Sequence, residues 1–296
     1  MSMIHTPNNI LDSNINGSYT NREKMRFLNK CIIVTGSNSG IGKATALLFA
    51  KEGASVLIHG RNIETIQSTV EECKEIGNET AKFPMVQGSF DEDGIIKKIN
   101  ETAMAEFGKI DILVNNAGEP KQSTTITGSE DVFDRQINSL LKAPIFLSQI
   151  CFPELRKSNV NIVNVSSMLG SRASAYNITF YGIAKAGLNQ FTQCAGIEYG
   201  SKGVRVNAIC PGYVKTPLGL KTGRFKTVEE WEAAHVQRSA GVPMKKVGTA
   251  EETAKLIAFV ASDEATMMNG ACIIQDGGST LMGLDTQTIE NAAKFS

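Results

Sequence analysis

The sequence predicts an α/β fold, a doubly wound parallel sheet of about seven strands with helices on both faces. Two observations support this prediction. From Asn29 onward, short β-branched runs alternate with longer amphipathic stretches, and a glycine-rich turn follows the first of the short runs. Alternation of strands and helices is typical of a parallel sheet covered on both faces. Ligands of such sheets bind beyond the carboxyl ends of the strands.

The short β-branched runs predict strands at residues 31–35, 55–58, 82–87, 112–115, 161–166, 204–209 and 271–275. The amphipathic stretches predict helices around 41–52, 63–76, 94–107, 131–156, 174–199 and 250–261. Two sequences, Thr227-x-x-Glu230 and Thr249-x-x-Glu252, have the form of a capping box at a helix start. We expect residues 27–296 to form a single domain, with an insertion at about 214–246 that lies near the substrate.

The composition excludes several classes of partner. The 296 residues carry 30 basic and 30 acidic side chains, so no charge excess favours nucleic acid or an anionic membrane. No apolar run approaches the roughly 20 residues of a membrane span. Residues 1–26 are polar and lack the apolar core of a secretory signal, so we expect an N-terminal extension and a cytoplasmic location. The six cysteines are scattered without a CxxC pair, which predicts neither a metal site nor disulfides.

The glycine-rich turn is the first candidate binding site. It reads Thr-Gly-Ser-Asn-Ser-Gly-Ile-Gly over residues 35–42, between an apolar strand and an amphipathic helix. Glycines at this place allow a tight turn and the close approach of the backbone to a pyrophosphate, which lies at a helix N-terminus. The context predicts dinucleotide binding by the turn residues Gly36, Ser39, Gly40, Ile41 and Gly42.

Tyr181 and Lys185 form the candidate catalytic pair. Residues four apart on a helix share one face. A phenol beside an ammonium group can donate a proton near neutral pH, because the positive charge stabilises phenolate and lowers the pKa from about 10. By itself such a pair is more often a half-buried ring beside a surface charge. The catalytic interpretation therefore depends on the rest of the chain.

Five motifs in a fixed order supply that support. They are TGxxxGIG at 35–42, Asn-Asn-Ala-Gly at 115–118, Ser167, Tyr181-x-x-x-Lys185, and Pro211-Gly212-x-x-x-Thr216. Together they resemble the short-chain dehydrogenase/reductase family, in its single-domain branch with TGxxxGxG and YxxxK motifs. The resemblance covers about residues 27–281 and implies a Rossmann fold and a carbonyl reductase or alcohol dehydrogenase that uses NAD(P).

The resemblance implies four catalytic residues. Tyr181 would be the general acid for carbonyl reduction, or the base for alcohol oxidation, and Lys185 would lower its pKa and hold the nicotinamide ribose. Ser167 would hydrogen-bond the substrate oxygen and stabilise its developing negative charge. Asn138 would hold a water in a proton relay, although a helix-surface amide is the alternative. Ser166 is a rival for the role of Ser167.

The resemblance also implies the remaining cofactor contacts. Ser89 takes the place of an aspartate that meets the adenine in relatives, which leaves adenine recognition the least certain part of the site. The other implied contacts are Asn115, Ala117, Gly118, Tyr181, Lys185, Pro211, Gly212, Val214 and Thr216.

The end of the second strand predicts the choice between the two nicotinamide cofactors. It reads His59-Gly60-Arg61-Asn62, with no carboxylate before Glu64. An acidic residue at this place binds the ribose 2′-hydroxyl and repels a 2′-phosphate, whereas the fork of Arg61 suits phosphate oxygens. We therefore expect NADP(H) to be preferred and bound by Arg61 and Asn62, with NAD(H) as the alternative. A solvated turn arginine is the other interpretation of Arg61.

The predicted reaction moves a hydride between the nicotinamide and a carbonyl or secondary alcohol of a small, apolar substrate. Substrate contacts are expected from Ser167, Met168, Tyr181 and Tyr213, with Leu169, Phe180, Leu218 and Trp231 as further candidates. The resemblance also implies a homodimer or homotetramer. A catalytically silent NADP-binding sensor or scaffold on the same fold is the alternative function, and the presence of Ser167, Tyr181 and Lys185 together argues against it.

Overall fold

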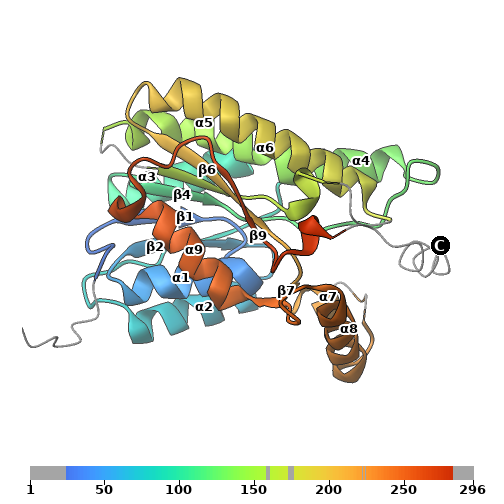
Figure 1. The fold of residues 1–296 in the computed structure, drawn as a ribbon. Helices are drawn as coiled ribbons and strands as arrows, with labels where there is room; N and C mark the ends of the chain where they lie inside the picture. Colours follow the sequence, from blue (N-terminus) through green and yellow to red (C-terminus); the bar gives the residue numbers. More distant parts are fainter. Residues whose placement is uncertain (1–24, 158–160, 173–176, 222, 224, 283–296) are drawn as a thin grey trace, which may run out of the picture.

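The computed structural model describes residues 25–157, 161–172, 177–221, 223 and 225–282. Its centre is a sheet of seven parallel strands in the order β3-β2-β1-β4-β5-β6-β9 (Figure 1). The chain starts at β1, runs outward through β2 and β3, and then returns to the other side of β1 with β4. The strands are β1 (Cys31–Val34), β2 (Ser55–Gly60), β3 (Met85–Gln87), β4 (Ile112–Asn115), β5 (Asn161–Val165), β6 (Arg205–Pro211) and β9 (Cys272–Gln275).

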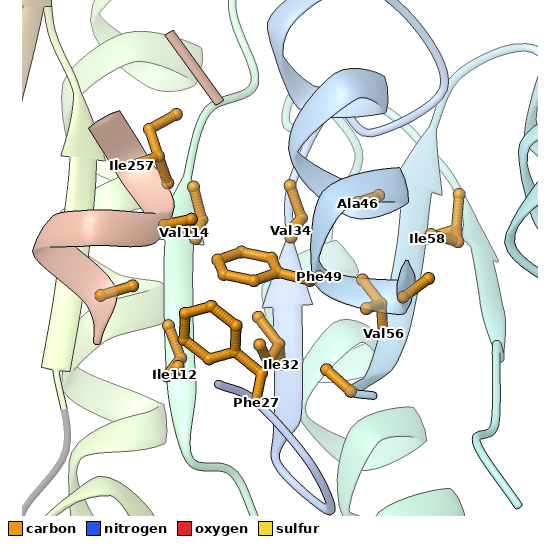
Figure 2. Packing of buried hydrophobic residues seen from close by; sticks show 14 of the residues in the cluster. Phe27, Ile32, Val34, Ala46, Phe49, Val56, Ile58, Ile112, Val114 and Ile257 are labelled. Atoms are coloured by element: carbon orange, nitrogen blue, oxygen red, sulfur yellow. The ribbon is translucent and has the colours of Figure 1, made fainter. Parts of the chain in front are cut away.

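Helices cover both faces of the sheet (Figure 1). One face carries α1 (Gly40–Lys51), α2 (Ile63–Ile76) and α9 (Ala250–Ala261), and the other carries α3 (Ile95–Phe107), α5 (Ala143–Leu155) and α6 (Thr179–Gly200). Figure 2 shows the core under α1, where Phe27 and Phe49 pack edge to face with ring centroids 4.7 Å apart. The predicted fold class and strand order along the chain are confirmed.

One predicted helix is wrong. Residues 131–156 form α4 (Glu130–Ile137), a π-helical segment (Asn138–Lys142) and α5 rather than one continuous helix. Pro144 in the first turn of α5 has no N–H to donate to the preceding turn. The chain widens here, and the N–H of Ala143 bonds the carbonyl of Asn138 five residues back.

The segment 214–246 contains regular structure that the sequence analysis did not assign. It holds β7 (Val214–Lys215), α7 (Leu218–Lys221) and α8 (Val228–Gly241), and β7 pairs with β8 (Gly248–Thr249). Thr227 caps α8 by accepting the N–H of Glu230 at 3.2 Å, but the Glu230 carboxylate accepts the N–H of Lys226, so the predicted capping box is complete at Thr249 and not here. Figure 1 shows α7 and α8 at the end of the molecule that also carries α4.

The predicted N-terminal extension lies outside the described residues up to residue 24. Its last residue, Arg26, is docked onto the domain, where Nε lies 2.6 Å from Oε2 of Glu52. The next residue, Phe27, is only 1% exposed. The packed domain therefore begins before residue 27. Among the described residues, no helix combines the length and apolar character needed to cross a membrane.

Candidate active site

A cavity of about 400 Å³ lies at the carboxyl edge of the sheet. Its wall is built from the turns that follow β1 to β6, together with Tyr181 and Lys185 of α6. Because β2 and β4 lie on opposite sides of β1, the chain leaves the sheet in two directions at this edge. This is the switch point at which open α/β sheets bind their ligands.

The glycine turn contributes residues 36 and 38–41 to the wall of the cavity. Gly36 and Gly40 have positive φ angles of 64° and 55°, which favour glycine. A Cβ on Gly42 would lie 2.3 Å from the carbonyl oxygen of Gly36, so only glycine allows this close packing. Ser39 begins α1 without a side-chain capping bond, which leaves the first N–H groups of the helix to an outside acceptor. Together with Ile41, these turn residues fit a pyrophosphate.

His59 is hydrogen-bonded to the glycine turn, a role that the sequence analysis did not predict. Its backbone exchanges hydrogen bonds with Ser37, and its Nδ1 accepts the N–H of Gly36 at 3.2 Å. Burial lowers the pKa of His59 to about 4, so the ring is neutral and its proton is on Nε2. The ring packs against Phe90, and a backbone hydrogen bond with Gly88 opposes part of the pKa shift. His59 therefore positions the glycine turn at the edge of the cavity.

Asn115, the last residue of β4, and Asn116, which follows it, have different roles. The side-chain amide of Asn115 donates to Oδ1 of Asn164 at 2.9 Å and to Oγ of Ser148 at 3.1 Å, so it joins neighbouring elements and does not line the cavity. The next residue, Asn116, lines the wall and donates to the carbonyl oxygen of Thr35 at 2.8 Å. The predicted cofactor contact of Asn115 is therefore a structural one, and its neighbour faces the cavity.

Three of the predicted catalytic residues meet in the cavity wall. Ser167 follows β5, and its hydroxyl is hydrogen-bonded to the phenol of Tyr181. Lys185 donates from Nζ to the carbonyl oxygen of Val165 at 2.7 Å, and the same Nζ lies 5.7 Å from the ring centroid of Tyr181. The rival residue, Ser166, donates its hydroxyl to the backbone carbonyl of Lys185 at 3.2 Å. This leaves Ser167 as the hydroxyl beside Tyr181.

The pKa values of Tyr181 and Lys185 differ from those expected from the sequence. Burial raises the pKa of Tyr181 to about 12, and the hydrogen bond from Ser167 opposes the shift only in part. Burial also lowers the pKa of Lys185 to about 8. The pKa of Tyr181 is therefore raised overall and not lowered, because desolvation of the phenol is the largest effect, and the predicted influence of Lys185 stays a prediction.

Besides Gly42 and Asn115, three predicted site residues do not line the cavity. The side-chain oxygen of Asn62 accepts the N–H of Thr65 at 2.8 Å and caps α2, so it is a helix-capping residue. Met168 is 4% exposed and is packed into the core. Asn138 starts the π-helical segment, and the next residue, Ser139, lines the wall in its place. The carbonyl of Asn138 accepts one backbone N–H, from Ala143, and has a second lone pair, so the water relay stays a prediction.

The remaining predicted cofactor contacts line the wall, as does Leu218, whereas the further substrate candidates Leu169, Phe180 and Trp231 do not. Ser89 bonds Oδ2 of Asp91 at 3.3 Å and lies beside Phe90. The indole N–H of Trp231 donates to the carbonyl oxygen of Thr216 at 3.1 Å, which fastens α8 to the loop after β6. The other predicted residues in the wall are Ala117, Gly118, Pro211, Gly212, Tyr213 and Val214.

Arg61 lines the cavity and is held by an acidic residue that the sequence analysis missed. Its Nη2 lies 3.0 Å from Oε2 of Glu119, and Lys121 binds the other oxygen of that carboxylate at 2.9 Å. At the neighbouring position, a Cβ on Gly60 would lie 2.4 Å from Cγ of Asn38. The side chain of Asn38 thus fills the space that an acidic residue at position 60 would need.

Comparison with known proteins agrees with this site. Residues 36–280 match the family model described as enoyl-(acyl carrier protein) reductase. An uncharacterized oxidoreductase of Thermotoga maritima is 38% identical over 86% of this chain and 99% of its own length. The 3-oxoacyl-[acyl-carrier-protein] reductase FabG of the same organism is 36% identical, with the same coverage of both chains. The solved structure of L-sorbose reductase from Gluconobacter frateurii, complexed with NADPH and L-sorbose, is 28% identical, with a TM-score of 0.81 over 88% of this chain and 100% of that chain.

The chain belongs to the short-chain dehydrogenase/reductase family, which confirms the resemblance identified from the motifs. It is an oxidoreductase that acts on CH–OH or C=O groups with a nicotinamide cofactor.

Proposed function

We propose that this protein is an NADP(H)-dependent oxidoreductase acting on the carbonyl or secondary alcohol of a small, apolar substrate. The observation that carries the proposal is the convergence of Ser167, Tyr181 and Lys185 on the cavity that also contains the glycine turn. Tyr213 and Leu218 lie in the same wall and supply apolar surface for the substrate. A sensor or scaffold without catalytic activity would not need this hydroxyl, phenol and lysine together at one cavity.

The residues of this chain supply the proton and the electrostatics of the reaction. When bound, the cofactor donates or accepts a hydride at the substrate carbon. The hydroxyl of Ser167 donates a hydrogen bond to the substrate oxygen and stabilises the negative charge that develops there. Tyr181, with its pKa raised to about 12, is fully protonated at neutral pH and is the proton donor for carbonyl reduction. The positive charge of Lys185 opposes the cost of forming phenolate in the same buried space.

The preference for NADP(H) follows from the end of β2. Arg61 is 66% exposed at its side chain and can reorient toward a phosphate. Asn38 occupies the space over Gly60, where an acidic residue would otherwise select NAD(H). The NADPH complex of the related L-sorbose reductase supports the proposal.

A substrate panel tests the reaction. Small apolar ketones and the matching secondary alcohols are supplied with NADPH, NADH or their oxidised forms, and nicotinamide absorbance is followed. Tyr181→Phe should lose at least about a hundredfold in rate on any accepted substrate, in line with the usual worth of general acid catalysis. The matched control is Tyr199→Phe, which removes the same atom from a ring that stacks on Phe152 away from the cavity. A Tyr181→Phe enzyme with the wild-type rate would refute the mechanism.

The cofactor preference has its own test. Dissociation constants for NADPH and NADH are measured by calorimetry for the wild type and for Arg61→Asp. The variant should weaken NADPH binding strongly and NADH binding much less, because a carboxylate at position 61 repels the 2′-phosphate. Equal losses for both cofactors would show that Arg61 does not read the phosphate.

We also propose that the protein is a cytoplasmic homodimer or homotetramer. The edge strand β9 presents Ile274 at 46% exposure, and α5 and α6 present Phe146 and Ile197 at 48% and 77%. Exposed apolar side chains on packed elements favour a subunit interface. The six cysteines are scattered along the chain without a CxxC pair, which favours a reducing compartment. Light scattering after size exclusion gives the mass, and a monomer at micromolar concentration would contradict the assembly.

A further inference from the structure

Glu119 holds an unusual place in the cofactor cavity. It follows β4, whereas its partner Arg61 follows β2, and β1 with the glycine turn lies between these two strands. Both residues line the same cavity. Their ion pair, bidentate at 3.0 and 3.3 Å, therefore joins the two sides of the cavity next to the glycine turn.

The two partners differ in how firmly they are held. The side chain of Glu119 is 12% exposed and that of Arg61 is 66% exposed. The backbone carbonyl of Glu119 also accepts a hydrogen bond from the amide of Gln136 at 3.0 Å. The carboxylate is the fixed partner, and the guanidinium is the one that can move.

Lys121 completes the arrangement. Its Nζ lies 2.9 Å from Oε1 of Glu119, so the carboxylate binds two cations at once. Both cations lower the pKa of Glu119 against the opposing effect of burial, so the carboxylate is ionised at neutral pH. If Arg61 turns away, Lys121 still pairs with the half-buried charge. This makes the release of Arg61 far less costly than leaving a buried carboxylate unpaired.

We propose that Glu119 is a specificity-determining residue that competes with the cofactor 2′-phosphate for Arg61. The 2′-phosphate binds by taking the place of the carboxylate on the guanidinium, and Glu119 remains paired with Lys121. NADP(H) affinity is thereby set below what Arg61 alone would provide, and the ratio of NADP(H) to NAD(H) affinity is tuned by a residue outside β2. This inference rests on the proposed binding of the 2′-phosphate by Arg61.

Calorimetric titration with NADPH, NADH, adenosine 2′,5′-bisphosphate and AMP tests the competition without any turnover. Glu119→Gln should tighten NADPH and the bisphosphate by a factor of about two to five, the usual worth of a partly exposed ion pair. NADH and AMP affinities should stay unchanged. The matched control is Glu64→Gln, which removes the same charge from an exposed residue of α2 three positions from Arg61. This control variant should have the same ratio of NADPH affinity to NADH affinity as the wild type.

A second variant should change NADPH affinity in the opposite direction. Lys121→Met removes the cation that keeps Glu119 paired, so Arg61 is held more tightly and NADPH affinity should fall relative to NADH. In the Glu119→Gln background, the same lysine change should leave the ratio nearly unaffected. Circular dichroism and melting curves verify that each variant is folded.

The outcomes separate this inference from the proposed function. An unchanged or lowered NADPH to NADH ratio in Glu119→Gln overturns the competition. Weaker NADH binding in that variant would instead identify Glu119 as a ligand of the ribose hydroxyls. Arg61→Gln is measured beside it. If Arg61→Gln lowers NADPH affinity while Glu119→Gln has no effect, only the competition fails. If Arg61→Gln leaves the ratio unchanged, the proposed NADP(H) preference fails as well.

Discussion

Replacement of Lys185 by methionine should make the cofactor-free protein more stable at neutral pH, although it should abolish activity. Lys185 is 4% exposed, and burial lowers its pKa from 10.5 to about 8. At about 1.4 kcal/mol for each pKa unit, the buried charge costs the folded state about 3 kcal/mol at pH 7. Methionine keeps most of the side-chain volume but leaves the carbonyl of Val165 without its 2.7 Å donor, which costs about 1–2 kcal/mol. The net gain is about 1–2 kcal/mol.

The pH dependence distinguishes this reasoning from a simple change in packing. Between the folded pKa of about 8 and the unfolded value of 10.5, the unfolded chain binds the extra proton, so wild-type stability rises with pH. Near pH 10 most of the charge penalty is gone, and Lys185→Met should then be no more stable than the wild type, or about 1 kcal/mol less stable. Urea unfolding followed by far-ultraviolet circular dichroism at both pH values measures the difference.

The control is Lys202→Met, at an exposed lysine just after α6, which should show no pH-dependent difference from the wild type. If Lys185→Met is destabilised by the same amount at pH 7 and pH 10, desolvation of the lysine does not govern stability. A buried charge that lowers stability for the sake of function is a common property of active sites.

Three further predictions follow from the same contacts. The kcat/KM for carbonyl reduction should fall as pH rises through about 8, because Lys185 loses its charge there; a rate that stays level from pH 7 to 9 would contradict this. Gly118→Ala should cost about 1–3 kcal/mol in urea unfolding, because the new Cβ would lie 2.1 Å from Cδ2 of Leu140. The double variant with Leu140→Ala should lose less unfolding free energy than the two single variants lose together. If the two losses simply add, the predicted clash with Leu140 is refuted. Gly60→Asp should gain NADH affinity, measured by calorimetry, only together with Asn38→Gly; a gain from the single change would show that Asn38 is no obstacle.

The sequence alone determined the fold class and predicted which residues meet at the candidate active site. Hydrophobic periodicity and a glycine turn are local properties, so they can be identified without knowing which strands are neighbours. Ser167 and the glycine turn meet because parallel strands end at one edge of the sheet, and Tyr181 joins them from α6. Pro144 is visible in the sequence, but the residue pattern over 131–156 does not predict the π-helical segment that precedes α5.

Tertiary structure decided the side-chain environments. Which asparagine at the end of β4 faces the cavity depends on the partners of Asn115 on neighbouring elements, up to 49 residues away. The sign of the Tyr181 pKa shift depends on burial, which is a property of the packed cavity rather than of the Tyr-x-x-x-Lys spacing. Arg61 meets Glu119 across 58 residues of chain. Such long-range contacts exist only once the sheet has formed, so no local pattern could have identified the carboxylate beside Arg61.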